Sequence, residues 1–252
     1  MTSRPTIGRL VSGAYAILLG EGGNYLNLVM VPFIVSVILN PAVLMIGFER
    51  LEESPNLLFL VLILQILSFL FWVPLIVAVH RRIILNEAFA AGGFFERLGA
   101  RSTGLYFRAA LLLGLMFALV ISLPFMGSKQ PTPGGGVALS LIAVVAMIYV
   151  FGYLFILPAK AVKEDATWAE ARSWIQGAKL NVFAALIVAL VPLHLVGLSL
   201  IWTIETAVPA VEFLLRPLIA TVIGMGDSIL VAAILSYAFK AAYSKEADAS
   251  DA

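Results

Sequence analysis

Long apolar segments separated by short polar ones dominate the chain. Six segments are long enough to cross a membrane, and they cover residues 24–43, 56–79, 104–126, 137–158, 181–203 and 217–239. A hydrocarbon core of about 30 Å requires roughly 20 apolar residues in helical conformation. The pattern therefore predicts an all-α integral membrane fold with six transmembrane helices.

Three shorter segments, which begin at Thr6, Asn86 and Thr167, precede pairs of these spans. In the first, apolar residues recur at helical spacing from Ile7, with polar residues opposite, which is typical of a helix that lies in the membrane interface. The second is interrupted by two glycines, which weaken helices. The third begins with T-W-A-E, a capping-box pattern in which Thr167 caps the helix and Glu170 reaches back.

The starts of these segments lie 80 and 81 residues apart. We therefore expect three units, each an interface helix followed by a helical hairpin, at residues 6–82, 86–163 and 167–243. Together they form one polytopic domain over residues 1–243, followed by a disordered tail at 244–252. Because each unit contains two spans, all copies share one orientation, unlike the inverted repeats of many transporters.

Composition supports the membrane assignment. Of the 252 residues, 62% are hydrophobic and 12% are charged, whereas soluble domains are nearer half apolar and a quarter charged. The absence of cysteine excludes disulfides and thiolate metal sites. A net charge of +1 argues against nucleic acid as a partner.

The basic residues are distributed asymmetrically over the predicted loops, with 13 on one side and 3 on the other. The larger set comprises Arg4, Arg9, Arg81, Arg82, Arg97, Arg101, Arg108, Lys160, Lys163, Arg172, Lys179, Lys240 and Lys245. The smaller set comprises Arg50, Lys129 and Arg216. Positive charge is retained in the cytoplasm, so we expect both termini inside, in a bacterial inner (plasma) membrane.

Asp227 is an acidic residue near the middle of the sixth span, and His194 lies near the middle of the fifth. The two spans form a hairpin, which places both side chains at similar depth. A small-residue stripe of Gly224, Ser228, Ala232 and Ser236 beside Asp227 predicts close helix packing there. The pair is either a proton or ion site or a buried hydrogen bond that fixes the hairpin. We favour the second interpretation, because a transport pathway requires more polar lining than these spans provide.

Four arginines gather at the cytoplasmic edge of the second and third spans: Arg81, Arg82, Arg97 and Arg101. They are candidates for binding anionic lipid headgroups, although a purely topogenic role explains them equally well. Tyr149 and Tyr153 lie one helical turn apart in the fourth span, where packing is a better explanation than a substrate platform.

The sequence carries no motif of a known active site. Two histidines and no cysteine make a catalytic zinc site improbable, and H-E-x-x-H, G-x-S-x-G and a phosphate-binding loop are all missing. We therefore expect a protein that is not an enzyme and that binds no cofactor and no metal.

Three stretches carry a resemblance to a known family. They are T-I-G-R-L-V-S-G-A-Y-A-I-L-L-G-E-G-G-N-Y-L from Thr6, V-H-R-R-I-I-L-N-E from Val79, and L-P-A-K-A-V-K-E-D-A-T-W-A-E-A-R-S-W-I-Q-G from Leu157. The chain resembles bacterial six-span proteins that are similar to the membrane domain of glycerophosphoryl diester phosphodiesterases. The catalytic domain of those enzymes is soluble, so the resemblance implies a membrane module without phosphodiesterase activity and supplies no site residues.

The function expected from the sequence is a non-enzymatic membrane module that supports lipid or protein assembly. Its expected partners are the lipid bilayer with its anionic headgroups and another membrane protein. The alternative is a small transporter or channel-like protein that uses Asp227 and His194.

Overall fold

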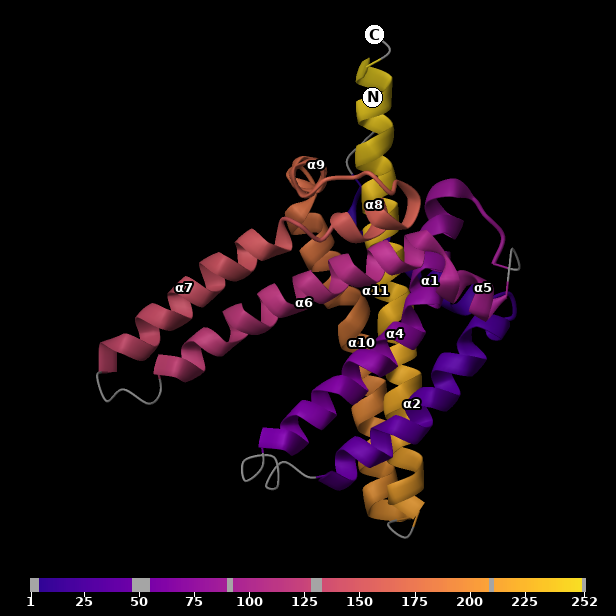
Figure 1. Cartoon of the computed structure of the whole chain (residues 1–252), viewed down its shortest axis with the longest axis vertical. Coiled ribbons are helices and arrows are strands. Elements are labelled where there is room, and N and C mark those ends of the chain that lie inside the picture. The colour runs from indigo at the N-terminus through magenta and orange to yellow at the C-terminus, as the bar shows by residue number, and fades with distance from the viewer. Residues whose placement is uncertain (1–4, 47–54, 90–92, 128–132, 209–210, 251–252) are drawn as a thin grey trace.

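The computed structural model describes residues 5–46, 55–89, 93–127, 133–208 and 211–250. All regular elements within these ranges are helices (Figure 1). They are α1 (Ile7–Gly20), α2 (Leu26–Ile46), α4 (Pro55–Leu85), α5 (Phe94–Gly99), α6 (Arg101–Gly127), α7 (Pro133–Phe151), α8 (Ile156–Val162), α9 (Trp168–Ile175), α10 (Lys179–Ala207) and α11 (Glu212–Ser250).

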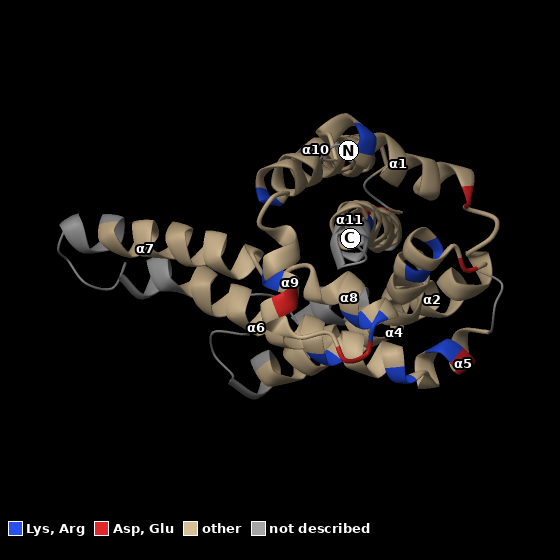
Figure 2. Cartoon of the chain, turned by 90° about the horizontal axis from the view of Figure 1, so that it is seen from above, with Lys and Arg blue, Asp and Glu red and all other residues tan. Residues whose placement is uncertain are grey.

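Helix α11 is the central element of the fold. It packs against α10, α4, α1, α2, α9 and α8, and the view along its axis shows these helices around it (Figure 2). Ile229, Ile234 and Phe239 on α11 are completely buried, as is Leu75 on α4. A helix that is apolar on all sides has to be surrounded by other apolar groups, and here protein supplies them.

Helices α10 and α11 form a closely packed hairpin. A Cβ atom added to Gly226 would lie 2.7 Å from Cδ2 of Leu193, and one added to Gly197 would lie 2.8 Å from Cγ1 of Ile223. Both glycines therefore permit a separation of the helices that larger residues would prevent. The glycine of the predicted small-residue stripe, Gly224, faces open space instead.

A buried polar contact joins α2 to α4. The indole Nε1 of Trp72 donates to Oγ of Ser36 at 2.8 Å, and Oγ of Ser36 lies 3.3 Å from Oγ of Ser68. Hydrogen bonds of this kind between small polar side chains are common where membrane helices associate.

Helices α6 and α7, here called the α6–α7 arm, extend away from the rest of the molecule (Figure 1). Helix α6 contacts α8, α4 and α5, whereas α7 packs chiefly on α6. The Phe151 end of α7 also contacts α10, where the rings of Phe151 and Phe183 lie 5.6 Å apart. Many apolar side chains in the described part of the arm are therefore exposed, Leu119 and Leu141 among them.

The structure supports an all-helical protein with several helices able to cross a membrane. Five described segments are long and apolar enough: Phe59–Leu85, Arg101–Ser122, Ala138–Val162, Lys179–Ala207 and Leu215–Tyr243. They correspond to five of the six predicted spans. The first predicted span falls on α2, which is not among these five segments.

The short helices agree with the sequence in two of three places. Helix α1 starts at Ile7, and α9 starts at Trp168 with the capping box of Thr167 and Glu170 formed, as predicted. No helix starts at Asn86, which adopts a left-handed conformation with φ of 58° directly after α4. Asparagine tolerates this conformation, which ends α4, so the next helix is the six-residue α5 from Phe94.

Helix α11 continues to Ser250, where a disordered tail was expected from residue 244. Each predicted unit contains a short helix followed by two long ones, and the second also contains α8. An internal repeat in the evolutionary sense stays a prediction.

Candidate functional site

The structure brings the two predicted intramembrane residues together. Nε2 of His194 on α10 lies 3.4 Å from Oδ2 of Asp227 on α11. The side chain of His194 is 53% exposed and that of Asp227 is 28% exposed. The pair thus lies at the surface of the α10–α11 hairpin and outside its packed interior.

The hydrogen bonds of His194 limit the protonation states of the pair. Its Nδ1 lies 3.0 Å from the carbonyl oxygen of Leu190, which only accepts hydrogen bonds, so Nδ1 carries a proton. A hydrogen bond between Nε2 and Asp227 then requires one further proton. That proton lies either on the carboxyl group, with a neutral imidazole, or on Nε2, with a carboxylate. The pair is electrically neutral in both cases, which reduces the cost of placing it in a membrane.

One atom of this pair stays unsatisfied. Oδ1 of Asp227 is buried and has no hydrogen-bond partner among the described residues. A buried acceptor without a donor destabilises the protein, so this oxygen is the feature of the pair that packing alone does not explain.

Two of the four predicted headgroup arginines share one carboxylate. Nε of Arg81 lies 2.7 Å from Oε2 of Glu87, and Nη2 of Arg97 lies 3.4 Å from Oε1 of the same residue. Arg81 also donates to the carbonyl of Ala161, and Arg97 donates to the carbonyl of Ala88. Burial lowers the pKa of Arg97, and Glu87 opposes this shift. These arginines connect α4, α5 and α8.

The other two arginines are paired as well. Arg82 contacts Glu21 at the end of α1 through Nε at 3.0 Å and Nη2 at 2.9 Å. Nε of Arg101 lies 3.1 Å from Oε2 of Glu164, although its side chain is 79% exposed. All four candidates therefore have acidic partners within the chain. These carboxylates partly balance the positive charge of the arginines, so the arginines attract a lipid phosphate less strongly.

A buried histidine forms the hydrogen-bonded centre of the fold, and the sequence did not indicate it. Nδ1 of His80 lies 2.6 Å from Oγ of Ser236, and Nε2 lies 3.4 Å from Oη of Tyr106. Ser236 itself donates to the carbonyl of Ala232 at 2.7 Å. The geometry fits a neutral imidazole that accepts from Tyr106 and donates to Ser236, so every proton has an acceptor. His80 thereby joins α4, α6 and α11.

The sequence placed His80 with Arg81 and Arg82 at a basic edge, yet its side chain is fully buried. Sequence position alone hid this, because the burial depends on α6 and α11. The sequence offered one signal of this burial. His80 directly follows the apolar run that ends at Val79, and α4 continues through both residues.

A second polar cluster lies where α7 ends. Nη1 of Arg172 on α9 donates to Oη of Tyr149 at 3.0 Å and to Oη of Tyr153 at 3.2 Å. The two tyrosine rings pack edge to face, with centroids 5.5 Å apart. The packing of the two rings agrees with the sequence, while the arginine between their hydroxyls was not anticipated.

The described residues contain no group of three or more His, Cys, Asp or Glu side chains placed to hold a metal ion. No protein-family model matches the chain, and neither the curated proteins nor the solved structures contain a match. The resemblance to the membrane domain of glycerophosphoryl diester phosphodiesterases therefore stays a prediction.

Proposed function

We propose that the chain is a non-enzymatic multi-pass membrane module that supports a lipid or protein assembly through the α6–α7 arm. The proposal includes six spanning helices in three repeated units, with both termini in the cytoplasm of a bacterial cell. Helix α2 supplies the sixth span, because its 21 residues extend about 30 Å at 1.5 Å per residue.

The extension of the arm away from the bundle, with its apolar side chains exposed, is the observation that carries this proposal (Figure 1). On α7, Leu141, Val145 and Ile148 are 63%, 68% and 60% exposed. On α6, Leu119 is 66% exposed. A hairpin that leaves the bundle and presents apolar side chains on most sides offers a surface to lipids or to another membrane helix.

Photo-crosslinking tests the role of the arm. A benzophenone amino acid is introduced at Leu141 on α7 or, as a matched control, at Leu198 on α10, which is also 63% exposed. After irradiation in native membranes, we expect adducts of discrete mass at Leu141 and only mixed bulk lipid at Leu198. Identical adduct mixtures at both positions would contradict the proposal.

The unpaired Oδ1 of Asp227 favours one alternative, a small transporter or channel-like protein that uses the Asp227–His194 pair. A permeating proton or ion would provide the partner that this oxygen lacks. The alternative requires a flux that disappears when Asp227 is replaced by Asn while the protein still folds.

A further inference from the structure

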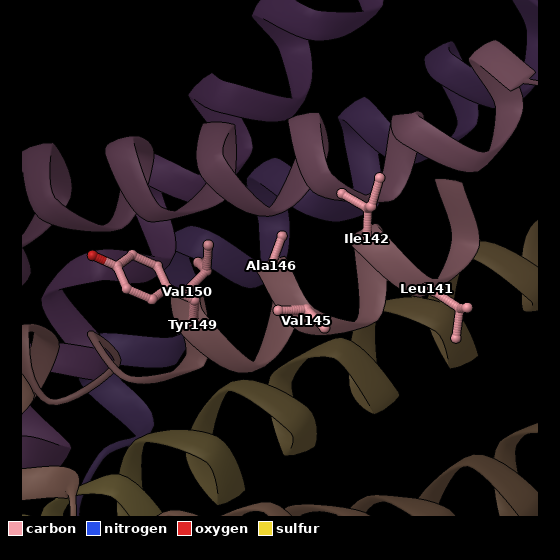
Figure 3. A pocket seen from close by; sticks show the side chains of 6 residues that line it. All are labelled: Leu141, Ile142, Val145, Ala146, Tyr149 and Val150. Atoms are coloured by element: carbon pink, nitrogen blue, oxygen red, sulfur yellow. The ribbon is translucent and has the colours of Figure 1, made fainter. Parts of the chain in front are cut away.

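An apolar groove runs along α7. It has a volume of about 530 Å³ and is lined by Leu141, Ile142, Val145, Ala146, Tyr149 and Val150. All six residues lie on one face of a single helix, so the groove is open and not an enclosed cavity. Figure 3 shows Tyr149 at one end of this row, with its hydroxyl directed away from the other five side chains. We call it the α7 groove.

Arg172 lies against Tyr149, the residue at one end of the α7 groove. Its guanidinium carbon lies 4.4 Å from the centroid of the Tyr149 ring and 5.6 Å from that of Tyr153. The hydroxyls that accept from Nη1 are uncharged, so they orient the guanidinium without neutralising it. Arg172 therefore presents a fixed positive charge where the apolar lining ends.

Lys179 adds a second positive charge at this end. A Cβ atom added to Gly152, the residue after α7, would lie 3.0 Å from Nζ of Lys179. The ammonium group thus lies against the backbone that follows the groove.

These two cations differ from the paired arginines of α4, α5 and α6. No carboxylate of the described residues forms an ion pair with Arg172 or Lys179. Arg81, Arg82, Arg97 and Arg101 all have such partners. Among the described residues, the two cations near the end of the α7 groove therefore have no carboxylate within ion-pairing distance.

We propose that the α7 groove binds an anionic phospholipid, with an acyl chain along the apolar lining and the phosphate on Arg172 and Lys179. The inference rests on the proposed function, because it requires the α6–α7 arm to lie in a bilayer. Guanidinium groups bind phosphate oxygens through two parallel hydrogen bonds, and lysine adds a point charge.

The arrangement of apolar and charged groups favours a lipid as the occupant. The two cations lie at one end of a long apolar helix. A phospholipid has the matching arrangement, with a charged headgroup at one end of its apolar acyl chains. Trp168, whose ring lies 5.9 Å from that of Tyr153, adds to an aromatic cluster of the kind that marks the headgroup level. A transmembrane helix of another protein would need a carboxylate at this same depth.

Native mass spectrometry of the full chain, purified in mild detergent, tests the site. The protein is titrated with phosphatidylglycerol or with phosphatidylcholine of identical acyl chains, and retained lipid is counted. The site variant is Arg172→Gln/Lys179→Gln. The matched control is Arg101→Gln/Arg108→Gln, which removes two positive charges from the start of α6. Val145→Trp keeps every charge and fills the groove at a position that is 68% exposed.

We expect wild type and the Arg101/Arg108 control to retain phosphatidylglycerol in preference to phosphatidylcholine. Each lost charge should weaken retention about fivefold, so the site variant should bind roughly 25-fold more weakly. Val145→Trp should also lose the lipid, and Arg172→Lys should recover part of the affinity. Inorganic phosphate at millimolar concentration should not displace the lipid.

Three results would overturn the site. The first is that wild type retains both lipids equally. The second is that the control variant loses as much phosphatidylglycerol as the site variant, and the third is that inorganic phosphate displaces the lipid. An adduct at Leu141 that is a protein and no lipid would also assign the groove to a partner helix. Flotation with liposomes tests the membrane module separately, so a chain that floats and crosslinks but retains no anionic lipid refutes this site alone.

Discussion

Nε2 of His194 and Oδ2 of Asp227 lie 3.4 Å apart across the α10–α11 hairpin, and Nδ1 of the same imidazole faces the carbonyl of Leu190. One shared proton therefore completes the pair and keeps it neutral. Next to the pair, Gly226 allows the hairpin to close against Leu193. These contacts satisfy one oxygen of the carboxyl group, whereas Oδ1 has no donor among the described residues.

A pair with its shared proton on the carboxyl group predicts different effects for two substitutions. In Asp227→Asn, the amide donates to Nε2 and replaces the carboxyl proton, so the free energy of unfolding should change by less than about 1 kcal/mol. His194→Ala leaves the carboxyl group without its partner and should cost about 1–3 kcal/mol. Thermal unfolding in detergent measures both. A larger loss for Asp227→Asn than for His194→Ala would show that the pair is ionised.

The buried imidazole of His80 should be among the most sensitive positions of the fold. Its replacement by Ala removes a side chain that joins three helices and leaves Ser236 and Tyr106 without their partner. We expect a loss of about 2–4 kcal/mol. Tyr106→Phe, which removes only the longer hydrogen bond, should cost about 1 kcal/mol. Denaturant titration of the detergent-solubilised protein checks the order, and equal stabilities of His80→Ala and wild type would contradict it.

Two glycines on α11, two residues apart, should respond in opposite ways to the same substitution. Gly226→Leu forces the new side chain against Leu193 and should destabilise the hairpin by about 1–3 kcal/mol. Gly224→Leu extends into open space and should leave the melting temperature unchanged or raised. Similar melting temperatures for both variants would mean that the close approach at Gly226 is not formed.

The capping box of α9 predicts a measurable titration. The backbone N–H of Thr167, then its hydroxyl, then Lys163 lower the pKa of Glu170 from 4.5 to about 2. Because the folded pKa is the lower one, the stabilisation is fully present above pH 4.5 and is lost as the pH falls through 2. NMR of the Glu170 carboxyl carbon measures the pKa directly.

Removal of the Thr167 hydroxyl should reduce this shift. In Thr167→Ala the hydroxyl is lost, so the pKa of Glu170 should rise towards its ordinary value. Ser173→Ala, on the same helix, removes a hydroxyl that contacts only the backbone of Glu170 and should leave the pKa unchanged. The proposed cap would be wrong if both variants titrated alike.

The sequence predicted those features that depend on local order. Apolar segment length predicted the five helices that are long enough to span a membrane, and the T-W-A-E motif predicted the start of α9, because both follow from neighbours in the chain. The approach of His194 to Asp227 was expected from their similar predicted depth in one hairpin.

Features that depend on contacts between distant segments could not be read in this way. The burial of His80 requires α6 and α11. The rotation of α11 relative to α10 determines that Gly226, and not Gly224, lies against the neighbouring helix. The pairing of the four arginines depends on Glu21, Glu87 and Glu164, of which only Glu87 is close in sequence to its partners. Arg172 reaches the α7 groove only because α9 folds back over the end of α7.

Proton flux into liposomes tests most directly whether Asp227 and His194 form a structural pair. Wild type, Asp227→Asn and His194→Ala are reconstituted at equal density, and a pH-sensitive dye inside the vesicles reports the flux after a pH step. We predict that all three match empty liposomes. A wild-type flux that disappears in a folded Asp227→Asn protein would contradict this prediction and assign the pair to transport.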